Sequence, residues 1–142
     1  MSGIALRYLR ASFFFLLYGM LVGLHLSAAL HLGRGGYGLG YISAHTHVQM
    51  IGFLLMGIAG VALWKLPEPA PGTNAALPGR CWWALVVLVL TRSTLEVLTS
   101  YATWGWLGAA IFGASCLEAV AVFALFRHLL ARARALRAQG PA

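Results

Sequence analysis

The sequence predicts an all-α fold, an integral membrane bundle of four helices that forms a single domain over residues 1–142. Composition is the first reason. Of all residues, 61% are hydrophobic and only 9% are charged, whereas a soluble domain has about a quarter of its residues charged. Hydropathy patterning is the second reason, because four apolar runs are each long enough to cross the roughly 30 Å hydrocarbon core of a bilayer. Membrane lipid is therefore the expected surrounding of the chain.

The four predicted spans are separated by residues that end helices. They cover about 9–32, 42–66, 80–102 and 106–130. A glycine-rich turn over 33–40 is too flexible to continue the first helix. Pro67, Pro69 and Pro71 end the second, and a short turn near Gly105 separates the third from the fourth.

Basic residues predict how the bundle is oriented. An up-down-up-down arrangement of four spans places both termini on one side of the membrane. The first loop has Arg34 and the third has no basic residue, whereas the two ends of the chain carry Arg7, Arg10, Arg127, Arg132, Arg134 and Arg137. Because cytoplasmic segments carry the excess of Lys and Arg, both termini are expected in the cytoplasm, with the protein in a bacterial or archaeal inner membrane. Topology thus accounts for the positive charge, and no nucleic-acid partner is expected.

Polar and ionisable residues from all four predicted helices fall in one layer of the membrane. Counting inward from the centre of each outer turn, at 1.5 Å per residue, places them between the outer third and the middle. They are His25 on the first helix, His45, His47 and Gln49 on the second, Arg92 and Glu96 on the third, and Glu118 on the fourth. Because such groups need partners in hydrocarbon, their common depth predicts a shared site inside the bundle.

Helical periodicity divides the second span into two faces. One face carries His45, Gln49, Gly52, Met56 and Gly60. We expect this face to point into the bundle core. His47 lies two residues from His45, about 200° around the helix, and is expected to face another helix, a second subunit or a second cofactor.

These residues fit a b-type haem. Imidazole is a common ligand of haem iron, and helical bundles hold cofactors by projecting side chains inward from facing helices. His45 is the expected ligand, with His25 at matching depth opposite it, and Gln49 and Gly52 on the same face as His45. Arg92 suits a haem propionate, because its planar guanidinium matches a carboxylate.

Other readings of the same residues stay open. Arg92 and Glu96, at spacing i, i+4, predict an ion pair that Glu118 could share, and this role is compatible with propionate binding. Copper or zinc is an alternative to haem, with His25, His45 or His47 as ligands and glutamates beside them, because the ligand types fit. A proton relay is a third reading.

The run His45-Thr46-His47-Val48-Gln49-Met50-Ile51-Gly52-Phe53 resembles the second helix of the catalytic subunit of haem-copper oxidases, especially the C-type oxidases and their nitric oxide reductase relatives. It is also similar to small NnrS-type and oxidase-subunit-I-like membrane proteins. The resemblance covers about residues 41–66 and implies that His45 ligates a low-spin haem b. Where the family often has asparagine, this chain has His47. The family's later helices, with the partner haem ligand and the copper ligands, have no counterpart here, so the chain is not expected to be a complete terminal oxidase or nitric oxide reductase.

The sequence therefore predicts a membrane b-type haem protein with an electron-transfer or accessory role in respiratory or nitric oxide metabolism. One alternative is a non-haem metal or gas-sensing module. Another is a structural subunit or assembly factor of a respiratory complex. Because four helices expose much of their interior, a homo-oligomer or a larger respiratory-complex partner is expected.

Overall fold

The computed structural model describes residues 2–35, 38–67 and 74–138. All regular secondary structure in these ranges is helical, and the elements are α1 (Gly3–Leu32), α2 (Leu39–His47), the π-helix η1 (Val48–Leu55), α3 (Met56–Lys65), α4 (Leu77–Leu98) and α5 (Trp106–Ala138). The turn residues Gly36 and Tyr37 and the prolines Pro69 and Pro71 lie outside the described residues.

Within the described ranges, four helices are long and apolar enough to cross a membrane, as the sequence predicts. Because α2, η1 and α3 form one continuous helix over Leu39–Lys65, these are α1, that composite helix, α4 and α5. Each helix extends beyond its predicted run at one end, and α4 ends at Leu98, before the predicted residue 102. The extensions are longest in the first and the last helix. The first begins at Gly3, where the Ser2 side chain caps it by accepting a hydrogen bond from the backbone N–H of Ala5. The last continues through its basic end to Ala138.

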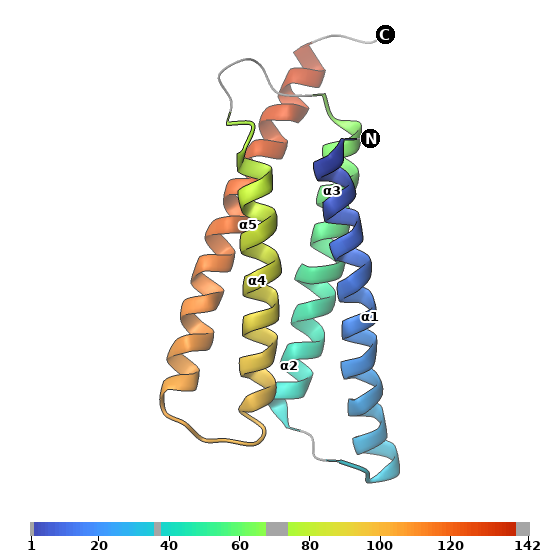
Figure 1. Ribbon diagram of the computed structural model, residues 1–142, viewed down its shortest axis with the longest axis vertical. Coiled ribbons are helices and arrows are strands. Elements are labelled where there is room, and N and C mark those ends of the chain that lie inside the picture. Colours follow the sequence, from blue (N-terminus) through green and yellow to red (C-terminus); the bar gives the residue numbers. More distant parts are fainter. Residues whose placement is uncertain (1, 36–37, 68–73, 139–142) are drawn as a thin grey trace.

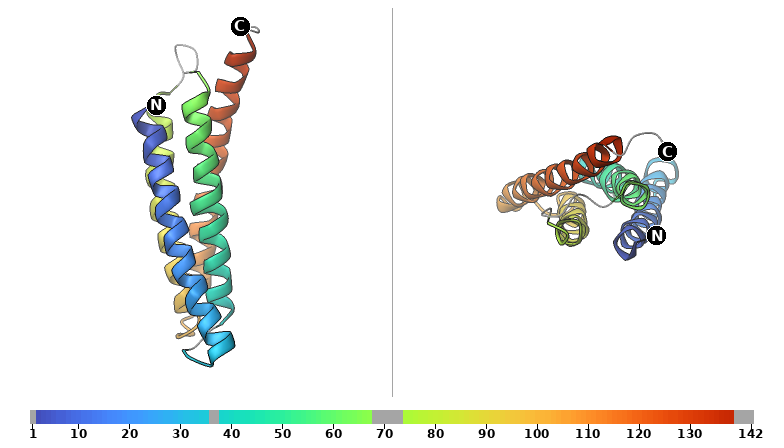
Figure 2. Two further views of the ribbon diagram at one scale, coloured as in Figure 1. Left: turned by 90° about the vertical axis from the view of Figure 1, so that its right-hand side faces the viewer. Right: turned by 90° about the horizontal axis from the view of Figure 1, so that it is seen from above.

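The helices lie side by side, and the start of α1 and the end of α5 are at the same end of the bundle (Figure 1). In the view along the bundle, α4 lies beside α5 and α1 lies beside the composite helix (Figure 2). The α2 segment also packs on α4, whereas α5 approaches the composite helix mainly at α3. The buried core between these helices includes Tyr8, Phe15, Met56, Leu85 and Val89.

Close contact along one face joins α1 to the composite helix. A Cβ atom added to Gly52 would lie 2.5 Å from Cγ of Phe15, and one added to Gly60 would lie 2.9 Å from Cγ of Leu9. The Ser12 hydroxyl also donates a 2.8 Å hydrogen bond to the carbonyl of Phe53. Small residues thus let the two helices touch directly, as is common inside membranes.

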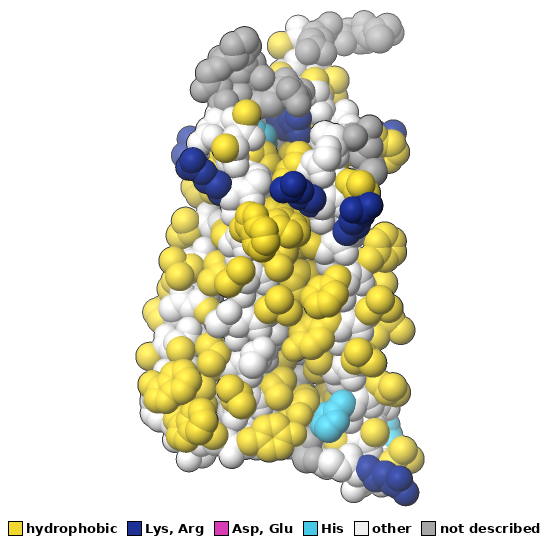
Figure 3. All heavy atoms as spheres, in the orientation of Figure 1, with side chains coloured by type: hydrophobic (Ala, Val, Ile, Leu, Met, Phe, Trp, Pro, Cys, Tyr) yellow, Lys and Arg dark blue, Asp and Glu magenta, His cyan; other side chains and the backbone are white. Residues whose placement is uncertain are grey.

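The surface suits a lipid environment. On the face shown in Figure 3, apolar side chains cover the middle of the bundle, and basic side chains gather toward the end that holds the start of α1. Large apolar side chains from every span are exposed, among them Phe13, Ile58, Val87 and Phe112. Such a belt would be unfavourable in water but is ordinary in hydrocarbon.

Candidate functional site

A cluster of polar side chains from three helical segments lies within the bundle. We call it the polar cluster, and it consists of Ser43 and His47 of α2, Arg92 and Glu96 of α4, and Glu118 of α5. Its first contact is the predicted ion pair, because Nε of Arg92 donates to Oε1 of Glu96 over 3.0 Å. The pairing at spacing i, i+4 is therefore confirmed.

Glu118 connects the cluster to α5. Its carboxylate oxygens each lie 2.9 Å from Nε2 of His47. Oε2 also lies 3.5 Å from Nη1 of Arg92. The prediction that His47 faces another helix is confirmed, and so is the sharing of Arg92 between the two glutamates. Side-chain exposure is 10% for His47 and 4% for Glu118, so this contact is largely shielded from the surroundings.

Glu96 connects the cluster to the beginning of α2. Its Oε1 accepts a 2.8 Å hydrogen bond from the Ser43 hydroxyl, while Oε2 is buried without a hydrogen-bond partner in the described part of the chain. Sequence reasoning missed Ser43. Its spacing of four residues from His47, which puts both on one helix face, was the available signal.

A glycine sets the approach of α2 to α4. The backbone of Gly40 packs on the backbone carbonyl of Glu96, so closely that an added Cβ would overlap that oxygen. The same Cβ would lie 2.5 Å from the Thr99 hydroxyl oxygen. A residue without a side chain is required here, and the contact holds Ser43 and His47 at the level of the glutamates.

A cleft of about 510 Å³ borders the polar cluster. We call it the polar cleft. Its polar lining comes from Ser43, Thr46, His47 and Arg92, and its apolar lining from Leu39, Ile42, Met50 and Ile51. The cluster therefore has one side that a small molecule dissolved in the bilayer can approach.

His45 faces α1, on the other side of the composite helix from the cluster. Its Nδ1 lies 2.9 Å from the backbone carbonyl oxygen of Gly19, and its ring edge rests on Gly23, where an added Cβ would lie 2.7 Å from Cε1. A carbonyl oxygen can only accept, so Nδ1 carries the proton in this contact and donates it. The neutral tautomer then leaves the lone pair on Nε2.

His25 contacts a different part of the composite helix. Its ring stacks on Tyr41, with centroids 4.6 Å apart, and the Tyr41 hydroxyl is 2.6 Å from that of Tyr101. Tyr41 precedes His45 by four residues, about 6 Å along a helix. The structure thus places the two histidines on touching helices but gives each its own partner.

The space between α1 and the composite helix is filled at the level of His45. Gln49 packs on Gly19, where an added Cβ would lie 2.7 Å from Nε2, and Gly52 is covered by Phe15. These contacts leave no room for a porphyrin ring between the two helices. Arg92, the expected propionate partner, is engaged with the two glutamates on the opposite side.

The described residues give no support to the alternative of a copper or zinc site. Within the described ranges, no group of three or more His, Cys, Asp and Glu side chains is arranged to hold a metal ion. Cys81 is buried in α4 and Cys116 is exposed on α5, and both are free thiols.

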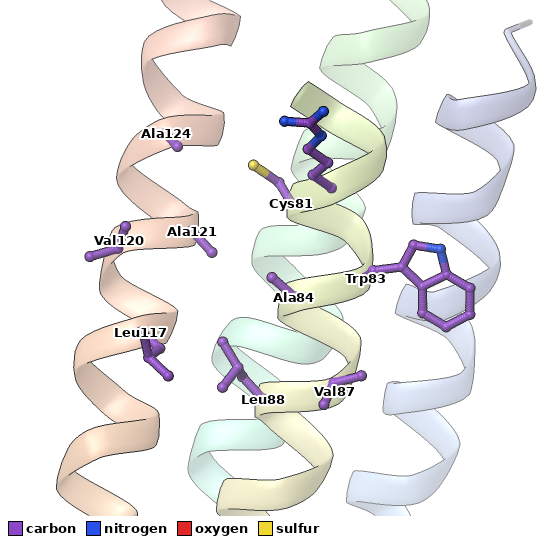
Figure 4. Close-up of a pocket in the computed structure, with 10 residues that line it drawn as sticks. Cys81, Trp83, Ala84, Val87, Leu88, Leu117, Val120, Ala121 and Ala124 are labelled. Carbon is purple, nitrogen blue, oxygen red and sulfur yellow. The ribbon is translucent and has the colours of Figure 1, made fainter. Parts of the chain in front are cut away.

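A second groove, between α4 and α5, is almost entirely apolar. Ala84 and Leu88 of α4 and Leu117 and Ala121 of α5 face one another across it, while the Trp83 ring points away (Figure 4). Its volume is about 580 Å³. A groove lined by hydrocarbon is ordinary lipid-facing surface.

Comparison of this chain with protein-family models, with curated proteins and with solved structures finds no match.

Proposed function

We propose that this protein is an inner-membrane subunit that binds a b-type haem through His45 and serves electron transfer, or an accessory role, in respiratory or nitric oxide metabolism. We further propose that its spans run up, down, up and down with both termini in the cytoplasm. The arginines at the two chain ends support that orientation, and so does the position of both helix ends at one end of the bundle (Figure 1).

One observation carries the haem proposal, the hydrogen bond between Nδ1 of His45 and the carbonyl of Gly19. Histidines that ligate metals are commonly fixed in this way, because the bond orients the ring and reserves Nε2 for the metal. His45 as a whole is only partly buried. When bound, haem would supply one-electron chemistry or a site for a diatomic gas.

The space around His45 limits where a haem could bind. His45 fits an axial ligand, but the filled contact between α1 and the composite helix does not fit the ring. We therefore propose that His45 would hold a haem outside this filled contact, together with a second copy of the chain or a respiratory-complex partner. In this form of the proposal the His25 ring remains stacked on Tyr41. Arg92 remains paired with Glu96 and Glu118 and does not bind a propionate.

A reduced-minus-oxidised absorption spectrum of the full chain, purified after expression with added haem precursor, tests the proposal. A haem b band is expected, and His45→Ala should remove it. His31→Ala is the matched control, because His31 is an exposed histidine on the same helix as His25. In His25→Ala the band should remain low-spin, because His25 stays on Tyr41 in this proposal, and a high-spin band would contradict that part of it. A colourless preparation, or a band that survives in His45→Ala, would refute the proposal.

A structural subunit or assembly factor is the second candidate, and the direct packing of α1 on the composite helix favours it. His45 and Gln49 fill space against α1, and Phe15 of α1 covers Gly52. This candidate predicts a colourless protein that co-purifies with a larger membrane complex in mild detergent. It also predicts that Gly23→Leu, which crowds His45, breaks that association.

A further inference from the structure

We propose that the polar cleft binds a neutral, membrane-soluble ring that carries carbonyl oxygens, which is the chemistry of a quinone. This inference does not depend on haem binding, because the polar cleft borders the polar cluster and not the contact between His45 and Gly19. Its volume of about 510 Å³ lies within the range of roughly 300–1,000 Å³ that holds small organic ligands.

The apolar lining indicates that the ligand enters from the bilayer. Leu39 is 85% exposed, Met50 53% and Ile42 43%, and all three line the cleft. A ligand that reaches the polar cluster through these side chains must itself be soluble in hydrocarbon. An aromatic ring with an alkyl substituent satisfies this condition, and a water-soluble metabolite does not.

The polar lining indicates that the ligand must accept hydrogen bonds. A guanidinium has five N–H donors, and in the described part of the chain Arg92 directs Nε at Glu96 and Nη1 toward Glu118. Donors are left over on a side chain that is 23% exposed and lines the cleft. A carbonyl oxygen is the simplest partner for them in hydrocarbon, where an unpaired donor is costly.

The hydroxyls of the cleft are already used. Ser43 donates to Glu96 over 2.8 Å, and Thr46 donates to the backbone carbonyl of Ile42 over 2.9 Å. Because these groups are satisfied, binding specificity falls on Arg92, with the imidazole of His47 beside it.

The charge of the polar cluster selects a neutral ligand over an anion. Arg92 contributes one positive charge, and Glu96 and Glu118 contribute two negative charges. The sum is −1 with a neutral His47 and zero with a charged one, so in neither state does the cluster attract an anion. A fatty acid or a haem propionate is thereby disfavoured, and an uncharged carbonyl is favoured.

Photoaffinity labelling tests the proposal with an azido-substituted ubiquinone analogue as the probe. The full chain in lipid nanodiscs is irradiated with the probe, and the labelled peptides are identified by mass spectrometry. We expect labels on the residues around Ile42 and Met50, and we expect excess decylubiquinone to remove at least about nine tenths of them. Decyl alcohol, which shares the alkyl chain but has no ring, should not compete.

Two matched variants separate the cleft from general lipid exposure. Ile42→Trp fills the cleft and should abolish labelling, whereas Ile58→Trp places the same ring on another exposed position of the same composite helix and should leave labelling unchanged. Arg92→Lys keeps the charge but loses the planar fork, and it should weaken competition by decylubiquinone about tenfold. Labels spread over all lipid-facing helices, labelling that survives Ile42→Trp, or equal competition by decyl alcohol would each overturn the proposal.

Discussion

Replacing Gly40 by alanine should destabilise the bundle even though alanine is the better helix former. Gly40 lies in α2, and its backbone packs on the carbonyl of Glu96 in α4. A methyl group there meets backbone rather than a flexible side chain, so the two helices must separate for it to fit. That separation would also move Ser43 and His47 away from the glutamates.

The change in the free energy of unfolding for Gly40→Ala is the sum of two opposing contributions. Overpacking costs typically about 1–3 kcal/mol, and contact with a rigid carbonyl belongs near the upper end. The change from glycine to alanine within a helix returns up to about 1 kcal/mol. The net loss in the free energy of unfolding is therefore about 2 kcal/mol, or about 30-fold in the ratio of folded to unfolded protein.

Gly113→Ala is the matched control. Gly113 lies inside α5 with open space where a Cβ would stand. Alanine at this position therefore gains helix propensity and overlaps no neighbouring atom. Unfolding of both variants in mixed micelles, followed by circular dichroism as the fraction of dodecyl sulfate is raised, gives the comparison. Gly40→Ala should be less stable than Gly113→Ala by about 3 kcal/mol. Equal stability of the two variants would refute the claim that backbone contact fixes the α2–α4 distance.

Two further predictions concern the end of the bundle where the chain begins. Tyr8→Phe removes the buried 2.9 Å hydrogen bond from the Tyr8 hydroxyl to the carbonyl of Pro78, and it should lower the free energy of unfolding by roughly 1 kcal/mol in the same assay; no change would mean that water replaces the bond. Arg132→Ala removes the hydrogen bonds from Nε to the carbonyl of Pro67 (2.9 Å) and from Nη1 to the carbonyl of Leu63 (3.2 Å), and it should cost about 1.5–3 kcal/mol or more. Arg134→Ala, on the exposed side of α5, should be nearly neutral. Equal losses in the two variants would argue against a specific role for the Arg132 bonds.

The spans could be predicted from the sequence because apolar length reports directly on the thickness of the bilayer. Their ends could not, because a helix continues into water where its residues favour it. The basic end of α5 to Ala138 is one case, and the first turn of α1 with its Ser2 cap is another. Hydropathy marks the limits of the hydrocarbon and not the limits of the helix.

The polar cluster was largely predictable, because the spacing of Arg92 and Glu96 and the angle between His45 and His47 are properties of single helices. The relation of His25 to His45 was not, because it depends on how two helices slide past each other. Counting inward from the centre of the first loop assumed that the end of α1 and the start of α2 lie at the same depth. Instead His25 meets Tyr41, the third residue of α2, so α1 reaches past the start of α2.

The π-helical stretch Val48–Leu55 follows directly after His47 and separates the half of the composite helix that holds the polar cluster from the half that packs on Leu9. Its hydrogen bonds span one residue more than those of an α-helix. An α-helix turns about 100° per residue and a π-helix turns less, so α-helical winding of the same eight residues would rotate the segment Leu39–His47 relative to α3. His47 would then turn away from Glu118. The π-helical winding of these eight residues therefore sets the direction in which His47 faces α5.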